Sequence, residues 1–142
     1  MPFITFDAQG ALDTDVKSGR IKIMNEWSRK ANTLGWWDYA FGGAVYDVPR
    51  VYFNLQRDML RIAYSNNVRA LFNQAEGAIE DGPKRYLYYK LMWDINDDTD
   101  RLMKDWYEAC VGKEAAPYLA DYFEWWDNFW KMEAIKTEWF QG

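Results

Sequence analysis

The fold is decided by two blocks of sequence, LGWWDYAFGG (34–43) and VRALFNQAEG (68–77). Each block begins with apolar and aromatic residues, which strands favour, and each ends at a glycine. Between them, residues 50–66 place apolar side chains at three- and four-residue spacing, which predicts a helix. Strand, helix and strand in this order predict a βαβ crossover in a parallel sheet. We expect the second strand, VRALF, to be buried on both faces.

Polar and aromatic side chains gather where both predicted strands end. In parallel α/β folds, the side chains and loops at the carboxyl ends of strands build the binding site. Seven residues lie at these two ends, namely Trp36, Trp37, Asp38 and Tyr39 in the first block and Asn73, Gln74 and Glu76 in the second. The sequence therefore predicts a site here without a complete catalytic apparatus.

The remainder of the chain is predicted to be helical. The expected boundary signals are Thr14 or Asp15 before a helix over residues 16–31, Asn66-Asn67 after residues 50–66, Pro83 in a first turn, Asp98 or Thr99 as a cap, Gly112 as a stop and Pro117 at the start of the last helix. On that last helix, apolar residues form a broad stripe, and we expect Asp121, Glu124 and Asp127 to lie outside it.

Length and composition indicate one globular unit. The chain has 142 residues, of which 49% are hydrophobic and 27% charged, and the aromatic share of 19% is high. We predict a single unit over residues 1–142, with a partial βα portion over 1–81 and a helical cap over 82–142. The net charge of −5 argues against a nucleic-acid partner.

Several functional classes are disfavoured by what the sequence lacks. It contains no His, which removes Ser-His and Cys-His nucleophile schemes and the commonest zinc ligand. Cys110 is the single cysteine, and we expect it to be small and buried. There is no apolar run of about 18 residues and no signal-peptide pattern, so we predict no membrane partner for this chain.

The segment DINDDTDRLMKD (94–105) imitates a calcium-binding loop, with oxygen-bearing side chains at positions one, three, five, seven and twelve. Position six, where such loops need glycine, is Thr99. A turn followed by a helix N-cap is the favoured interpretation, and we predict no metal and no cofactor.

Four motifs occur in an order that resembles a known family. They are Trp37-Asp38-Tyr39 for a "WdY" strand end, residues 68–74 for a "GVrGvFeQG" strand, residues 88–94 for "YvlAkLLWdP" and residues 110–117 for "YYGpAAepmr". Over roughly residues 20–131, the chain is similar to the C-terminal half of the bacterial family called domain of unknown function 4838.

Members of that family look like glycoside hydrolases with a (β/α)8 barrel related to alpha-glucuronidases. The resemblance implies an α/β fold, mostly helical by content, in which the two predicted strands are the last two of a barrel and the later helices form a C-terminal cap. A full barrel needs about 250 residues. The resemblance thus implies a longer parent, secreted or periplasmic, whose N-terminal barrel portion is missing from this chain.

Glycosidases need two carboxyl groups across the scissile bond. The family's strand motif carries Glu where this chain has Asn73, which cannot titrate, and Asp38 and Glu76 are the two acids at predicted strand ends. We predict these two as the catalytic pair. The predicted sugar-binding residues are Trp36, Trp37, Tyr39, Asn73 and Gln74. In the alternative interpretation, Asp38 braces the following loop and the Trp pair packs in the barrel floor.

The last helix and its tail carry a second aromatic cluster, Trp125, Trp126, Trp130 and Trp139. It would suit a carbohydrate platform or a partner surface, but helical spacing favours packing. The first expectation for function is the C-terminal part of a glycoside-hydrolase-like protein that acts on or binds polysaccharide and is inactive alone. The alternative is a small, aromatic-rich helical binding or scaffolding domain without catalysis.

Overall fold

The computed structural model describes residues 1–5, 9–39, 48–74 and 81–136. The chain forms two compact units, each described here by itself. Unit 1 contains residues 1–41 and 54–76, and unit 2 contains residues 42–53 and 77–142. The fold is mixed α/β and mostly helical, as the sequence predicts. The sequence-based division between residues 81 and 82 stays a prediction.

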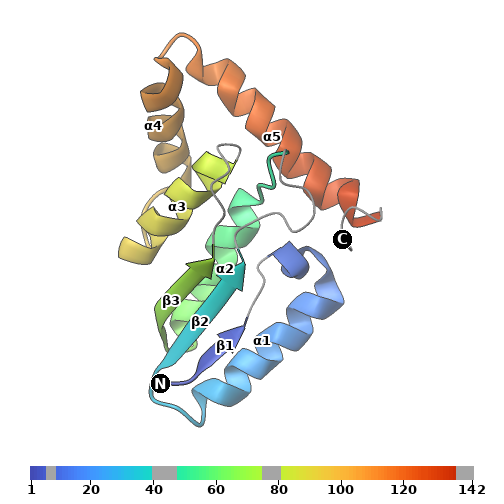
Figure 1. Cartoon of the computed structure of the whole chain (residues 1–142), viewed down its shortest axis with the longest axis vertical. Coiled ribbons are helices and arrows are strands. Elements are labelled where there is room, and N and C mark those ends of the chain that lie inside the picture. Colours follow the sequence, from blue (N-terminus) through green and yellow to red (C-terminus); the bar gives the residue numbers. More distant parts are fainter. Residues whose placement is uncertain (6–8, 40–47, 75–80, 137–142) are drawn as a thin grey trace. The chain divides into compact units, whose positions relative to one another are not determined.

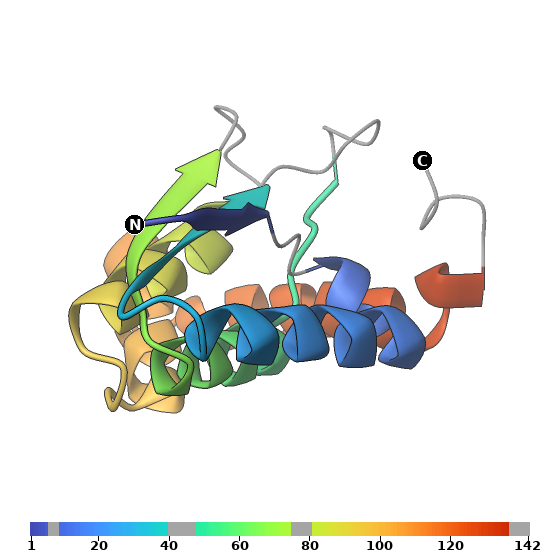
Figure 2. The same cartoon turned by 90° about the horizontal axis from the view of Figure 1, so that it is seen from below.

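Unit 1 is a three-stranded parallel sheet with its helices on one face (Figures 1 and 2). Its elements are β1 (Phe3–Thr5), the 3-10 helix η1 (Gln9–Leu12), α1 (Thr14–Ser28), β2 (Leu34–Tyr39), α2 (Phe53–Ser65) and β3 (Val68–Gln74). The strands lie in the order β1-β2-β3, so both crossovers move in the same direction across the sheet. Because parallel crossovers share one hand, α1 and α2 cover the same face.

The parallel βαβ crossover is confirmed, but the predicted number of strands is wrong. β1 is a third strand, and its Phe3 pairs with Gly35 and its Thr5 with Trp37. Three residues are too few to show an alternating pattern, so the sequence gives no warning of this strand. The two predicted strands are therefore the second and third of three.

The expected burial of β3 on both faces is also wrong. Val68 is buried at the start of the strand, but Phe72 is 48% exposed. The cause is the one-sided helix layer, because a strand is enclosed on both faces only where helices cover both.

One irregularity interrupts the pairing of β2 with β3. Leu34 pairs with Val68, but the next residue, Gly35, pairs with Ala70, so Arg69 has no counterpart on β2. Two residues of one strand opposite one residue of its neighbour is the pattern of a β-bulge. Beyond this point the register continues regularly to the ends of both strands.

Helix boundaries in unit 1 follow local hydrogen bonding. The N-cap of α1 is Asp13, whose carboxylate accepts the backbone N–H of Asp15 at 2.9 Å and of Val16 at 3.0 Å, so the predicted caps were one and two residues too late. The helix also ends earlier than predicted, at Ser28. After α2, Asn67 has φ 62°, which confirms the predicted left-handed stop.

Unit 2 is helical. It contains α3 (Gly82–Trp93), α4 (Thr99–Val111), α5 (Ala116–Met132) and the 3-10 helix η3 (Ala134–Lys136). The predicted cap of α4 is confirmed, since the Asp98 carboxylate accepts the backbone N–H groups of Asp100 at 2.9 Å and Arg101 at 3.2 Å. Gly112, with φ 79°, ends α4 as predicted and turns the chain toward α5.

Aromatic side chains fill the space between α4 and α5. Tyr107 stacks on Phe123 with ring centroids 6.1 Å apart, and Trp106 meets the same Phe123 ring edge-on at 5.8 Å. Two expectations for these helices are wrong. Cys110 is exposed, and Asp127 lies on the buried face of α5.

Candidate functional site

The ends of β2 and β3 lie side by side in the sheet. In the parallel register, Asp38 pairs with Asn73 and Tyr39 pairs with Gln74. The structure therefore brings together the two strand ends that the sequence singles out.

Strand alternation separates these residues into two sets. Successive side chains of a strand point to opposite faces, and paired residues of neighbouring strands share a face. Trp37, Tyr39 and Gln74 belong to the face without helices. Trp36, Asp38 and Asn73 belong to the face covered by α1 and α2.

Aromatic rings occupy the face without helices. The rings of Trp37 and Phe72 are tilted against each other with centroids 4.4 Å apart, and Tyr39 lies 6.4 Å from Trp37. Trp37 is 37% exposed, Tyr39 36% and Phe72 48%. Phe3, which is 51% exposed, adds a fourth ring. We call these four residues the open sheet face.

Gly35 allows Phe3 to lie across β2. A Cβ atom at position 35 would come within 2.6 Å of the Phe3 ring, closer than side-chain contacts permit. The glycine at this position is therefore a packing requirement that holds one ring of the open sheet face. Phe3 was not predicted as a site residue, because the sequence does not predict β1 as a strand.

Asp38 and Trp36 are fully buried on the helix face. A carboxylate removed from water needs hydrogen-bonding or ionic partners, because its desolvation otherwise costs several kcal/mol. Asp38 is thus one strand position away from the rings of the open sheet face rather than among them. Glu76, its predicted catalytic partner, lies outside the described residues.

Asn73 has buried hydrogen-bonding groups that the described structure does not use. Its amide nitrogen and oxygen are both inaccessible, and neither forms a hydrogen bond in the described part of the chain. Leaving such a group unsatisfied costs about 1–3 kcal/mol, and exceptions of this kind call for a functional or structural explanation. Asn73 is therefore the member of the predicted set with unused bonding capacity beside Asp38.

Unit 2 contains a buried polar network around Asp127. The Asp127 carboxylate accepts the backbone N–H of Phe53 at 3.1 Å and contacts the ammonium group of Lys131. Burial raises the pKa of Asp127, although the Lys131 charge and the Phe53 N–H oppose the rise. One turn further along α5, the indole N–H of Trp130 donates to the carbonyl oxygen of Pro49 at 2.6 Å. These bonds fix the chain segment before α2 onto α5.

A second buried polar group in unit 2 is the ion pair between Asp81 and Lys84. The Lys84 ammonium lies 3.0 Å from the Asp81 carboxylate, and the Lys84 side chain is 1% exposed. The same ammonium lies 5.3 Å from the centroid of the Tyr52 ring. In the sequence, this pair is indicated by an acid three residues before a lysine at a helix start, and it was not predicted.

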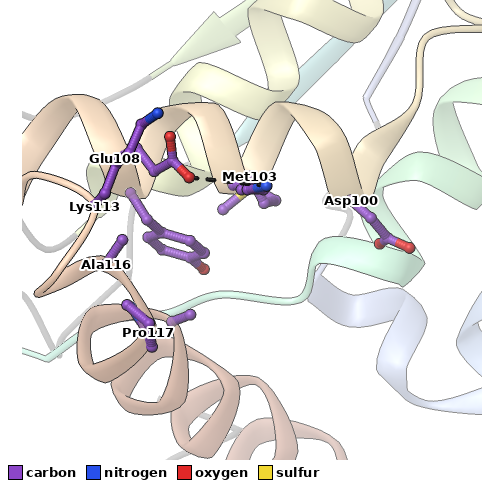
Figure 3. A pocket seen from close by; sticks show the side chains of 9 residues that line it. Asp100, Met103, Glu108, Lys113, Ala116 and Pro117 are labelled. Atoms are coloured by element: carbon purple, nitrogen blue, oxygen red, sulfur yellow. Dashed lines mark ion pairs between the residues drawn. The ribbon is translucent and has the colours of Figure 1, made fainter.

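A cavity of about 330 Å³ lies between α4 and α5 (Figure 3). Its lining residues are Asp100, Met103, Lys104, Tyr107, Glu108, Lys113, Ala116, Pro117 and Ala120. Lys104 and Glu108 pair across its rim at 3.8 Å, and Figure 3 marks this contact with a dashed line. Burial raises the pKa of Tyr107, so its phenol stays protonated at neutral pH. The cavity lining mixes both charges, with the carboxylates Asp100 and Glu108 beside the lysines Lys104 and Lys113.

Within the described ranges, no three acidic or cysteine side chains converge in a way that would hold a metal ion. None of the helices in those ranges has the length and apolarity needed to cross a bilayer.

A parallel βα unit followed along the chain by helices places the protein in the α/β class. Comparison with protein families gives a match to the domain of unknown function DUF4838 over residues 3–124. The chain belongs to this family. No curated protein and no solved structure matches it.

Proposed function

We propose that unit 1 is a carbohydrate-binding portion of a glycoside-hydrolase-like (β/α)8 barrel. The observation that carries the proposal is the open sheet face, where Trp37, Tyr39 and Phe72 present partly exposed rings at the carboxyl ends of β2 and β3. Flat aromatic faces of this kind stack on the apolar faces of sugar rings. Oligo- or polysaccharide is therefore the proposed ligand.

The sheet topology supports the barrel. All pairs are parallel, the strands follow chain order, and both helices lie on one face. A (β/α)8 barrel repeats this arrangement, with helices outside and the other sheet face lining the interior. In the proposed barrel, further βα units pair with the free edges of β1 and β3. The open sheet face then lines the interior, with Trp37, Tyr39 and Phe72 nearest the C-terminal mouth, where such barrels bind their ligands.

Polar groups beside the rings support binding of a hydroxylated ligand. Gln74 follows Phe72 at the same strand end and belongs to the same face as Tyr39. An amide offers both a donor and an acceptor to sugar hydroxyl groups. Small-molecule sites usually combine an apolar surface with a small number of polar groups.

The arrangement of these side chains supports sugar binding and not hydrolysis. Paired carboxyl groups must face each other across the scissile bond, whereas Asp38 is buried on the helix face. The catalytic roles of Asp38 and Glu76 stay predictions. We propose that the 142-residue chain binds oligosaccharide without cleaving it.

The test is a titration of the 142-residue chain with soluble xylo-, cello- and chito-oligosaccharides, followed by tryptophan fluorescence. Trp37→Ala should weaken binding about tenfold, the loss expected for one stacking ring. The matched control is Trp27→Ala on α1, because Trp27 is 43% exposed and Trp37 37%. The same mixtures, assayed for reducing ends, report hydrolysis.

Three outcomes would contradict the proposal. Fluorescence that no oligosaccharide changes would exclude binding by these rings. Equal weakening by Trp27→Ala and Trp37→Ala would show that position 37 is not special. Release of reducing ends that stops in Asp38→Asn would return Asp38 to a catalytic role.

The second candidate, a helical binding or scaffolding module, is favoured by a separate observation in unit 2. Tyr118, Tyr122 and Trp125 on α5 are 77%, 48% and 59% exposed. Exposed rings on a helix suit a protein partner as well as a sugar.

A further inference from the structure

Helix α5 carries apolar residues on two opposite faces. Its inner face is buried and includes Ala116, Phe123 and Trp130. A second set of apolar residues faces outward, and we call it the outer stripe of α5. It consists of Tyr118, Tyr122, Trp125, Phe129 and Met132. Met132 is 61% exposed, and the three rings before Phe129 are also exposed.

The outer stripe has the spacing of a helix–helix seam. Its members follow one another at intervals of four, three, four and three residues. This alternation gives an average repeat of 3.5 residues, which keeps one line of side chains facing a partner helix. At a rise of 1.5 Å per residue, the stripe runs for about 21 Å along α5.

The stripe is also symmetric along its length. Trp125 is its middle member, with Tyr122 and Phe129 on either side and Tyr118 and Met132 at the two ends. We propose that the outer stripe of α5 is the contact surface of an antiparallel homodimer, with Trp125 near the two-fold axis. A two-fold contact uses the same patch on both copies. Tyr122 of one copy then faces Phe129 of the other.

Charge supports the antiparallel orientation. Residues 118–125 carry Asp121 and Glu124, a sum of −2, whereas residues 129–136 carry two lysines and one glutamate, a sum of +1. Antiparallel pairing sets the acidic half of one helix against the basic half of the other. It also places Asp121 opposite Asn128, so no like charges meet across the seam, and it opposes the two helix dipoles.

The exposed area is sufficient for a weak dimer. An aromatic side chain offers about 150–250 Å². About half to three-quarters of Tyr118, Tyr122 and Trp125 is exposed, whereas Phe129 is half-buried, so each copy contributes roughly 500 Å². The dimer would bury about 1,000 Å² in total, the lower end for a specific interface. We expect a dissociation constant in the micromolar range.

The primary experiment is sedimentation equilibrium of the 142-residue chain between ~1 and ~100 µM. The expected mass at the upper concentration is twice the chain mass of 16.9 kDa. Trp125→Glu should raise the dissociation constant at least about 30-fold, because a central aromatic anchor is lost and a charge is buried. The control is Trp93→Glu at the end of α3, where Trp93 is 93% exposed and lies outside the stripe.

A cross-linking experiment tests the orientation. In a Cys110→Ser background, Asp121→Cys and Asn128→Cys chains are mixed and oxidised. Antiparallel pairing predicts a mixed disulfide between the two chains and little cross-linking of either chain with itself. Self-cross-linked products alone would indicate parallel helices and overturn the orientation.

Two results would overturn the dimer itself. One is a chain that stays monomeric at ~100 µM. The other is a Trp93→Glu variant that weakens dimerisation as much as Trp125→Glu does. Oligosaccharide binding that Trp125→Glu abolishes, in a chain that stays monomeric, would assign the outer stripe to sugar instead. None of these results bears on Trp37, so the dimer and the proposed carbohydrate site can fail separately.

Discussion

The open sheet face and the outer stripe of α5 both expose aromatic rings, but they differ in backbone and in neighbours. On the sheet, the rings of Trp37 and Phe72 lie 4.4 Å apart beside an amide at the strand end. On α5, the rings repeat at heptad spacing along about 21 Å of helix. A cluster of rings next to polar groups suits a small polar ligand, whereas a long apolar line suits another helix. The meaning of an exposed ring therefore comes from its spacing and its neighbours.

The largest effect should come from comparing the two faces of α5 itself. Trp130 is fully buried and donates to the Pro49 carbonyl oxygen, whereas Trp125 is 59% exposed. We expect Trp130→Ala to lower the free energy of unfolding by about 3–5 kcal/mol. Trp125→Ala should change it by less than about 0.5 kcal/mol in dilute monomer. Urea unfolding followed by circular dichroism measures both.

A loss above about 2 kcal/mol in dilute Trp125→Ala would contradict this division of α5. It would mean that Trp125 stabilises its own fold by more than its ring contacts with Trp126 and Phe129 on the same helix, and the proposed dimer would lose its central contact.

A smaller effect is expected at Asn73, on the helix face of the sheet. Because its buried amide forms no hydrogen bond in the described structure, Asn73→Leu should raise the free energy of unfolding by about 1 kcal/mol. The same variant should leave oligosaccharide binding unchanged, because the Asn73 amide lies on the helix face and not among the rings of the open sheet face. Thermal melts and the fluorescence titration give the two measurements.

A clear loss of stability in Asn73→Leu would contradict the expected gain. It would mean that the buried amide has a structural partner, and Asn73 would then be a residue that stabilises the fold. Gln74→Leu is the contrasting variant, since it removes the neighbouring amide on the open sheet face and should weaken oligosaccharide binding.

The smallest effect concerns pH and the inner face of α5. Burial raises the pKa of Asp127 above its ordinary value of 3.8, which the unfolded chain keeps. Between the two values, the folded chain holds a proton that the unfolded chain has lost, so stability decreases as pH rises through this window. Asp127→Asn cannot titrate. The wild type should therefore lose stability relative to this variant as pH increases from about 4.

Melting temperatures of the two proteins across this pH range provide the measurement. The melting-temperature difference between wild type and Asp127→Asn could instead stay constant with pH, or shift in favour of the wild type at higher pH. Either result would show that the Lys131 and Phe53 contacts outweigh the effect of burial on the pKa of Asp127.

The sequence was sufficient for the longer elements and for the pairing of the two strand ends. Strong apolar periodicity predicted α2, α4 and α5, and the parallel register brought Asp38 beside Asn73 as strand-end reasoning expects. It was insufficient where the outcome depends on neighbours. The three residues of β1 become a strand only by pairing with β2, and the exposure of Phe72 depends on which sheet face the helices cover.

Polar residues on helices show the same limit. Asp127 was expected to face solvent because it is an acid outside the apolar stripe of the last helix. Its hydrogen bond from the Phe53 N–H and its contact with Lys131 make its burial possible. Those partners are 74 and 4 residues away. The prediction for Cys110 was wrong in the opposite sense. It was expected to be buried, but in the last turn of α4 it is exposed.

The bulge at Arg69 determines which strand-end side chains reach each face. Strand parity has a period of two, so one extra residue reverses the facing of everything that follows it. If Arg69 paired with Gly35 in a regular ladder, every later residue of β3 would move one position along β2, so Phe72 would turn toward the helices and Asn73 would join the rings of Trp37 and Tyr39. The bulge thus acts as a parity switch. A family member of the same length without the bulge would present an amide, not a ring, to whatever this face binds, whereas one that lacked the bulged residue would keep the ring there.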